Sequence, residues 1–315
     1  MNPPSACSVI VPVYNSEGTL RELAVRLAAV LPKVAEQHEL LLVNDGSRDG
    51  SWGMVCDLAQ TYPWIRGIDL MRNYGQHNAL LCGIRFARGG MIVTLDDDLQ
   101  HPPEEIPKLV ERLSEGYDLV YGTPEAQRHG FWRDTASRLT KFGLQSALGA
   151  ETARKVSAFR AFRAPLRDAF LDYNGPLPCM DVLLTWGAQR VGSVTVRHDS
   201  RKEGRSNYDF PKLMRHTLNM ITGFSLWPLR LASLLGFAFT FFGFLVLVYV
   251  VGRFLIEGGS IPGFPFLASI IALFSGVQLF TLGIIGEYLS RVHFRTMGRP
   301  TYVVRRHSGP AEERR

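Results

Sequence analysis

The sequence has few cysteines, and they are far apart. Only Cys7, Cys56, Cys82 and Cys179 occur among 315 residues, and no two form a C-x-x-C pair. This scatter argues against a disulfide framework and against a zinc site, so we expect reduced thiols that face the cytosol. The first residues lead into an apolar stretch without a basic segment or a small-residue cleavage site, and we expect no secretory signal.

The first strand-to-helix turns lack glycine-rich phosphate-binding motifs. Neither G-x-G-x-x-G nor G-x-x-x-x-G-K-[ST] occurs there, which disfavours dinucleotide redox chemistry and P-loop hydrolysis. An extreme charge of either sign is also absent, since 35 Lys and Arg face 29 Asp and Glu. This moderate positive balance does not indicate nucleic acid, and no nucleic-acid partner is expected.

Two stretches near the C-terminus lack charged side chains altogether. They run from Leu231 to Gly252 and from Ile261 to Gly286, and each has about the 20 residues that a helix needs to cross hydrocarbon. We predict two membrane spans. Two buried core helices are the alternative, but such helices are usually shorter and carry a polar face. Arginines flank the pair while the connecting segment holds one arginine against Glu257, so the positive-inside rule places both flanks in the cytoplasm.

Strand and helix patterns alternate through the first 120 or so residues. Such alternation indicates a mainly parallel, doubly wound α/β sheet, whose ligands bind beyond the carboxyl ends of the strands. Polar clusters near Tyr14, Asp45, Arg72 and Asp96 all fall at such ends. The predicted strands are Cys7–Val13, Glu39–Val43, Ile65–Leu70, Met91–Leu95 and Asp118–Tyr121, followed later by Val191–Val196.

Three consecutive carboxylates follow the fourth predicted strand, and an amide comes two residues later. In extended backbone Asp96, Asp98 and Gln100 project to one side while Asp97 points away. Clustered negative charge repels itself unless a cation is present, and Mg²⁺ prefers one or two carboxylates together with substrate phosphate oxygens. The pattern therefore favours a metal–diphosphate site. The alternative is a polar turn whose aspartates cap the helix that starts near Pro103.

Two segments combine basic and apolar residues at helical spacing. They are residues 128–149 and 208–227, and this pattern is typical of helices that lie in a membrane interface and attract anionic lipid heads. Ordinary surface helices are the alternative, mainly for the first segment. If the interfacial interpretation holds, Arg128 and Arg133 are candidates to bind an acceptor phosphate, with Ser137 one turn beyond.

Five motifs and the two apolar stretches together resemble the polyprenyl-phosphate glycosyltransferases of glycosyltransferase family 2. Within that group the chain is most similar to the bacterial undecaprenyl-phosphate transferases related to the aminoarabinose enzyme and to dolichyl-phosphate mannose synthase. The likeness covers nearly the whole chain. The motifs are Pro12-Val13-Tyr14-Asn15, Val43-Asn44-Asp45-Gly46-Ser47, Arg72-Asn73-Tyr74-Gly75-Gln76-His77, Leu95-Asp96-Asp97-Asp98-Leu99-Gln100-His101-Pro102-Pro103-Glu104 and Arg201-Lys202-Glu203-Gly204-Arg205-Ser206-Asn207-Tyr208.

The resemblance implies a fold and a domain order. The fold is GT-A, of the α/β class: a doubly wound, mainly parallel sheet followed by a two-helix transmembrane hairpin. The implied parts are a cytosolic transferase domain (1–207), an interfacial amphipathic segment (208–228), two transmembrane helices (229–290) and a basic cytosolic tail (291–315). The implied location is the bacterial inner membrane.

The resemblance also implies roles for individual residues. Asp97 lies near the ribose or the metal, and Asp98 and Arg201 carry catalysis by stabilising the leaving diphosphate. A juxtamembrane arginine that meets lipid heads is the alternative for Arg201. The implied donor-binding residues are Pro12, Tyr14, Ser16, Val43, Asp45, Asp96, Asp97 and Arg201, and the implied metal ligands are Asp96, Asp98 and Gln100.

The implied activity is metal-dependent, inverting transfer of a sugar to a polyprenyl phosphate. The expected partners are a nucleotide sugar, with UDP favoured over GDP, the lipid phosphate and the membrane, and the cofactor is Mg²⁺ or Mn²⁺. A homo-oligomer stays open. The alternatives are a processive polysaccharide synthase and a non-catalytic membrane scaffold derived from such a transferase.

A few positions depart from the family pattern. Glu125 stands where relatives often carry an arginine just after the fifth strand. Arg154 or Lys155 stands where the family has an acidic residue. Asn207 replaces a usual lysine. Asp181 lies where some relatives carry a glutamate on a helix, and we expect an exposed helix acid there. These departures motivate the scaffold alternative. The joint presence of the residues expected to hold the metal and the diphosphate argues against it: Asp96, Asp98, Gln100 and Arg201.

Overall fold

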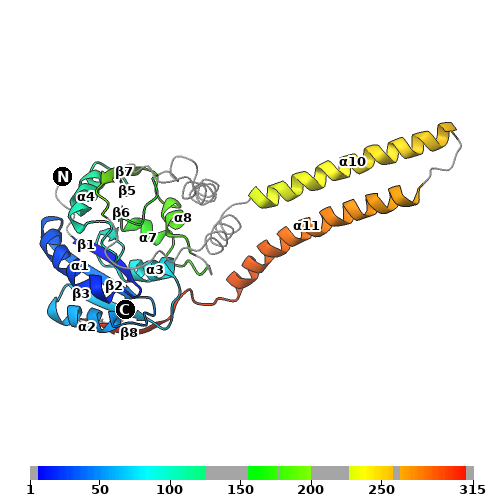
Figure 1. Ribbon diagram of the computed structural model, residues 1–315. Helices are drawn as coiled ribbons and strands as arrows, with labels where there is room; N and C mark the ends of the chain where they lie inside the picture. Colours follow the sequence, from blue (N-terminus) through cyan, green and yellow to red (C-terminus); the bar gives the residue numbers. More distant parts are fainter. Residues whose placement is uncertain (1–5, 125–154, 176–177, 200–226, 258–262, 310–315) are drawn as a thin grey trace.

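Eight strands form one mixed sheet, and two long helices extend away from it (Figure 1). The computed structural model describes residues 6–124, 155–175, 178–199, 227–257 and 263–309. Strands and helices alternate along its first part, as the sequence predicts. These elements are β1 (Ala6–Val13), α1 (Glu17–Val30), η1 (Leu31–Lys33), β2 (Gln37–Asn44), α2 (Ser51–Thr61), β3 (Ile65–Leu70), α3 (Gln76–Phe86), β4 (Met91–Thr94), η2 (Pro103–Glu105), α4 (Ile106–Ser114) and β5 (Leu119–Pro124).

The rest of the chain completes the sheet and supplies the long helices. The sheet has the strand order β7-β5-β6-β4-β1-β2-β3-β8. Neighbours pair in parallel except at β4·β6, β5·β6 and β3·β8. The later elements are β6 (Arg160–Arg163), α7 (Pro165–Asp168), α8 (Met180–Thr185), β7 (Val191–Val196), α10 (Trp227–Glu257), α11 (Phe264–Thr296) and β8 (Val304–Ser308).

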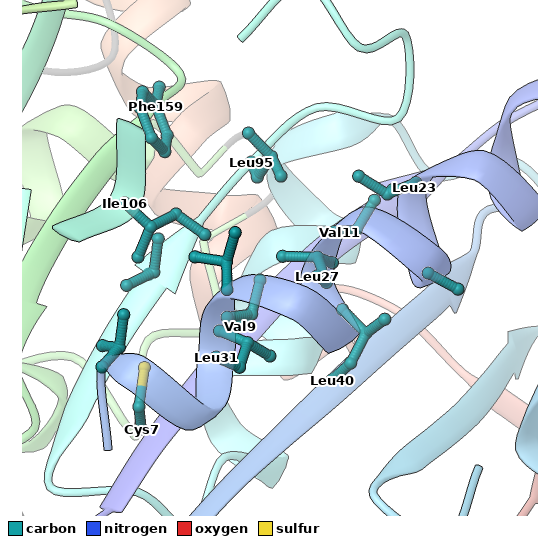
Figure 2. Packing of buried hydrophobic residues seen from close by; sticks show 14 of the residues in the cluster. Cys7, Val9, Val11, Leu23, Leu27, Leu31, Leu40, Leu95, Ile106 and Phe159 are labelled. Carbon is teal, nitrogen blue, oxygen red and sulfur yellow. The ribbon is translucent and has the colours of Figure 1, made fainter. Parts of the chain in front are cut away.

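Side chains of β1 alternate between two hydrophobic cores, because successive residues of a strand point to opposite faces. Val9 and Val11 lie in the cluster that includes Leu23 and Leu27 of α1, as Figure 2 shows. Ile10 lies in the other cluster, with residues of α3 and α8. Helices α1, α2 and α4 therefore cover one face of the sheet, while α3, α7 and α8 cover the other, which is the doubly wound α/β arrangement predicted from the sequence.

The two long helices lie side by side and project from the sheet (Figure 1). The spans Pro228–Ile256 and Leu273–Thr296 are long and apolar enough to cross a membrane, and none of either apolar window is buried. This exposure is the opposite of what the buried-core alternative requires. Gly243 of α10 leaves room for the Phe274 ring of α11, since a Cβ there would lie 2.8 Å from it.

The chain returns to the sheet after α11. Residues Val304–Ser308 form β8, which pairs antiparallel with β3. The sequence analysis predicts only a basic tail in this region, so the edge strand is an addition to it. Both ends of the helix pair are consequently joined to the same sheet (Figure 1).

Candidate functional site

The carboxyl ends of four parallel strands meet at one edge of the sheet. β1 has β2 and β3 on one side and β4 on the other, so the strand order reverses between β1 and β4. Crevices at such a reversal are where doubly wound sheets bind ligands. Residues that follow β1, β2 and β4 supply the polar groups. Pro12 and Val43, two of the predicted donor residues, lie opposite each other in β1 and β2 near this edge.

Asp97 joins the loop after β4 to the loop after β1. Its Oδ2 accepts hydrogen bonds from the backbone N–H of Tyr14, at 3.1 Å, and from the Ser16 hydroxyl. Burial raises the pKa of Asp97, and these two donors act in the opposite direction by stabilising the charged form. The middle carboxylate of the triplet thus binds the β1 loop.

Asp45 organises the loops after β2 and β3. Its two oxygens accept hydrogen bonds from the backbone N–H groups of Tyr74, at 2.7 Å, and Gly75, at 2.8 Å. Asp45 is 3% exposed, and burial raises its pKa against the effect of these donors. Carboxylate oxygens have further lone pairs, so contact with a base stays a prediction alongside this observed role.

The backbone turns sharply within the acidic segment. β4 ends at Thr94, one residue before the predicted end, and Leu99 adopts a left-handed φ of 59°. Asp96 Oδ1 accepts a hydrogen bond from the Gln76 amide at 2.6 Å, and Asp98 Oδ1 accepts one from the Gln100 N–H at 3.1 Å. Neither η2 nor α4 has a side-chain hydrogen bond at its N-cap, so the helix-capping alternative finds no support here.

The residues of this turn fit a hard divalent cation. Asp96 and Asp98 offer carboxylate oxygens and Gln100 an amide oxygen, which are the ligand types that Mg²⁺ and Mn²⁺ take. Among the residues that the structure describes, no group of three His, Cys, Asp or Glu side chains is placed to hold a metal ion alone. A site built from these side chains would leave coordination positions for substrate phosphate oxygens, as is usual for Mg²⁺.

His101 lies against the acidic turn. Its ring is 5.0 Å from the ring of His198 and 5.4 Å from that of Phe159, between centroids. Burial lowers the pKa of His101 to about 4, with a smaller contribution from His198, so the imidazole is neutral near pH 7. The next residue after His198 is also tied to the turn, because the Asp199 N–H donates to the Gln100 carbonyl at 2.8 Å.

Comparison with known proteins identifies the family. Residues 8–170 match the profile described as "Glycosyl transferase family 2". The chain belongs to glycosyltransferase family 2. The transferase is 36% identical over 301 residues to undecaprenyl-phosphate 4-deoxy-4-formamido-L-arabinose transferase of Aeromonas hydrophila, covering 94% of this chain and 92% of the relative. It is 35% identical over 302 residues to the protein of the same name from Pseudomonas paraeruginosa, covering 95% and 89%.

Solved structures show the same fold at lower identity. The transferase superposes on glucosyl-3-phosphoglycerate synthase from Mycobacterium tuberculosis with a TM-score of 0.51 and 20% identity, over 69% of this chain and 78% of that one. That crystal structure contains Mn²⁺, UDP and glucosyl-3-phosphoglycerate. Another mycobacterial protein superposes with a TM-score of 0.53 at 18% identity, over 69% and 73%. These likenesses confirm the GT-A-like mixed α/β fold of the transferase.

A buried polar network next to the site was missed by the sequence analysis. The Arg160 guanidinium pairs with the Asp181 carboxylate and donates to the Thr94 hydroxyl at 3.0 Å, and the Tyr121 hydroxyl donates to Asp181 at 3.2 Å. Burial lowers the pKa of Arg160, but the neighbouring groups, with Asp181 contributing most among them, together raise it above its usual value. The expectation of an exposed acid at Asp181 is wrong, because the residues of α8 are buried against the sheet and Asp181 is 7% exposed.

Several predicted residues of the transferase lie outside the described residues. They are the acceptor candidates Arg128, Arg133 and Ser137 and the diphosphate candidate Arg201, together with Glu125 and Asn207. Gln76 is the opposite case, since it lies within a motif quoted for the family but received no role. Its side chain could have been singled out only by knowing that the N-terminus of α3 approaches the end of β4.

Proposed function

We propose that the chain transfers a sugar from a UDP-sugar to a polyprenyl phosphate, undecaprenyl phosphate in particular, with inversion at the anomeric carbon. One observation carries the proposal: Asp97 of the acidic turn accepts hydrogen bonds from the β1 loop. This contact lies where the strand order of the sheet reverses, between β1 and β4. Relatives that span 94% of the chain carry the name of an undecaprenyl-phosphate sugar transferase, which supports the acceptor.

The donor nucleotide is proposed to lie across the ends of β1, β2 and β4. Asp45 sits at the end of β2, and the loop that carries Tyr14 and Ser16 sits at the end of β1. A solved structure of similar fold, glucosyl-3-phosphoglycerate synthase, contains UDP and Mn²⁺, which supports UDP over GDP and a divalent metal. Mg²⁺ and Mn²⁺ both suit the oxygen ligands of Asp96, Asp98 and Gln100.

The chemistry that the site must assist is the departure of a nucleoside diphosphate. A lipid phosphate with a second pKa near 6 is largely dianionic at neutral pH and can attack the sugar without a strong protein base. When bound by Asp96, Asp98 and Gln100, a divalent cation would neutralise negative charge on the leaving diphosphate. In-line attack then inverts the anomeric centre.

Arginines outside the described residues complete the proposal. Arg201 is proposed to clamp the donor diphosphate, because a guanidinium fork suits a bidentate contact with phosphate. Asp199, two residues earlier, is hydrogen bonded to Gln100, so the chain enters this segment beside the acidic turn. Arg128, Arg133 and Ser137 are proposed to bind the acceptor phosphate.

The helix pair is proposed to cross the bacterial inner membrane with the sheet in the cytoplasm. β8 follows α11 and pairs with β3, so the chain returns to the sheet after the second helix. Arg291, Arg295 and Arg299 follow the second apolar stretch, in agreement with the positive-inside rule. The exposed apolar faces of α10 and α11 also offer a surface for self-association within the bilayer.

Donor turnover tests the proposal directly. Membranes that contain the protein, undecaprenyl phosphate, Mn²⁺ and a panel of radiolabelled UDP-sugars and GDP-sugars are expected to form a labelled lipid, and chelation of the metal is expected to abolish it. Asp98→Ala is expected to lower the rate at least about 100-fold, because it removes a ligand of the proposed metal ion, whose charge stabilises the leaving diphosphate.

Asp57→Ala is the matched control, because Asp57 is an exposed aspartate on α2. It is expected to keep the wild-type rate. No labelled lipid from any donor would favour the non-catalytic scaffold, and a labelled polymer would favour a polysaccharide synthase. Full activity of Asp98→Ala would remove the acidic turn from the reaction.

A further inference from the structure

The strand that follows the helix pair lies against the loops of the donor site. Met71 ends the β3·β8 contact, with its N–H donating to the Val303 carbonyl at 2.9 Å and its own carbonyl accepting from the Arg305 guanidinium at 2.8 Å. The next residues of the chain form the loop whose N–H groups bind Asp45. The chain after α11 therefore contacts the residue from which the loop that binds Asp45 begins.

A charged side chain of β8 reaches a buried carboxylate of the sheet. Arg306 Nε donates to Asp69 Oδ2 at 3.0 Å, and the Asp69 side chain is 3% exposed. The other oxygen of Asp69 accepts from the Asn44 amide at 2.7 Å. A carboxylate at this depth is stable only when paired and hydrogen bonded, so Arg306 and Asn44 fix each other's positions through it.

Asn44 is connected by hydrogen bonds to the loops after β1 and β2, which carry predicted donor residues. Its Oδ1 accepts from the Ser47 N–H at 3.4 Å, and the Ser47 hydroxyl accepts from the Asn15 N–H at 3.0 Å. Asn15 Oδ1 accepts in turn from the Arg48 N–H at 2.8 Å. Asn15 has a left-handed φ of 54°, a conformation that persists only where surrounding contacts fix it.

We propose that Arg306 is a positioning residue for the donor site. It acts through Asp69 and Asn44 on the loops after β1 and β2, which makes donor binding depend on the strand that follows the membrane helices. The inference rests on the proposed function, because it concerns the same nucleotide site. Pairing of β8 with β3 uses backbone groups, so the side chain of Arg306 can be changed while the strand remains paired.

Binding of UDP with Mn²⁺ tests the proposal on the full chain in detergent. Arg306→Ala is expected to raise the dissociation constant about tenfold, within the usual range for coupling between sites. The KM for the nucleotide sugar is expected to rise in parallel while the KM for undecaprenyl phosphate stays unchanged. Arg306→Lys keeps the charge and is expected to recover most of the affinity.

Arg299→Ala is the matched control, because Arg299 is an exposed arginine in the connection between α11 and β8. It is expected to bind the nucleotide as the wild type does. An unchanged dissociation constant in Arg306→Ala, beside normal binding by the wild type, would overturn the inference. Failure of the wild type to bind any nucleotide would instead overturn the proposed function.

Hydrogen exchange tests the same coupling without a ligand. The amides of Asn15, Ser47 and Arg48 are expected to exchange several-fold faster in Arg306→Ala, and no faster in Arg299→Ala. Asp69→Asn is expected to give the same change, and the double variant Arg306→Ala with Asp69→Asn no more than either alone, because both act through one contact. Additive effects, or unchanged exchange in these loops, would contradict the inference.

Discussion

Three adjacent aspartates meet three different environments in this chain. Asp97 binds the β1 loop, Asp96 accepts from Gln76 at the start of α3, and Asp98 accepts from the N–H of Gln100. Asp97 therefore connects two loops of the sheet, while Asp96 and Asp98 supply the two carboxylates of the proposed metal site. The alternation of a strand predicts that Asp97 differs from its neighbours, although the backbone beyond Leu95 turns rather than extends.

The four cysteines differ enough in burial to be told apart chemically. Cys7 and Cys179 are buried, and burial raises their pKa to about 12 and about 11, so almost none of either thiol is ionised at pH 8. Cys56 is partly exposed and Cys82 is buried. Native alkylation with iodoacetamide at pH 8, followed by peptide mass spectrometry, is expected to label Cys56 first.

Denaturation in guanidinium provides the control, because all four thiols are expected to react once the chain unfolds. Native labelling of Cys7 at the rate of Cys56 would contradict the packing of β1 described above. The four thiols are free in the structure, and detection of a disulfide among them would contradict the prediction of reduced thiols.

The sequence predicts the positions of polar residues that directly follow a strand, but it does not predict contacts between residues that are far apart in the chain. Tyr14, Asp45 and Asp96 stand directly after apolar runs, so the sequence places them at the carboxyl edge. Asp181 carries no such local signal, because its burial depends on Arg160, which is 21 residues away, and on Tyr121, which is 60 residues away. The spacing of apolar residues along the chain cannot predict a side-chain contact over such a sequence separation.

At the scale of elements, apolar runs predict central strands well and edge strands poorly. β3 begins and ends where the sequence predicts, at Ile65 and Leu70, because its side chains are buried on both faces. β8 consists of Val-Arg-Arg-His-Ser and has mostly exposed side chains. It forms through backbone pairing with β3, and the propensity of an edge strand depends on that context.

Helix α8 is held to the sheet by the Arg160–Asp181 pair, and removal of the acid tests this. Asp181→Ala leaves Arg160 buried without its counter-charge, which typically costs about 3 kcal/mol or more. A loss of this size corresponds to a fall in Tm of about 6–12 °C for a domain of this size. Thermal unfolding in detergent, followed by circular dichroism, measures it.

Asp168→Ala is the comparison, because Asp168 pairs with Arg167 at the surface and its side chain is 64% exposed. Exposed pairs contribute little, so its Tm is expected to stay near that of the wild type. Equal Tm values for the two variants would mean that the buried pair does not hold α8 in place.

At the scale of the whole molecule, the chain leaves the sheet, passes through two long helices and returns to the sheet edge. The helix pair extends away from the sheet (Figure 1). Its apolar side chains are exposed, and such side chains are stable in the hydrocarbon of a bilayer. Phe241 and Leu245 lie near the middle of the first span and are 57% and 50% exposed. They are the positions at which a charge opposes insertion most.

Phe241→Arg together with Leu245→Arg is expected to reduce membrane integration strongly. An arginine at the centre of a span costs about 3 kcal/mol on the insertion scale, so the pair costs about twice that. Alkaline carbonate extraction of membranes, with immunoblotting of pellet and supernatant, measures the retained fraction.

Leu255→Arg with Ile256→Arg is the matched control at the end of the same span, where long side chains reach the interface. This variant is expected to remain in the pellet. Equal retention of both double variants would contradict a transmembrane role for α10.

The central claim is that the acidic turn after β4 binds the divalent cation that accompanies the nucleotide. A crystal structure of the protein with UDP and Mn²⁺, with anomalous scattering recorded for manganese, tests it most directly. The account predicts an anomalous peak about 2.0–2.2 Å from oxygens of Asp96, Asp98 or Gln100. A peak elsewhere, or nucleotide bound with no manganese at this turn, would contradict it.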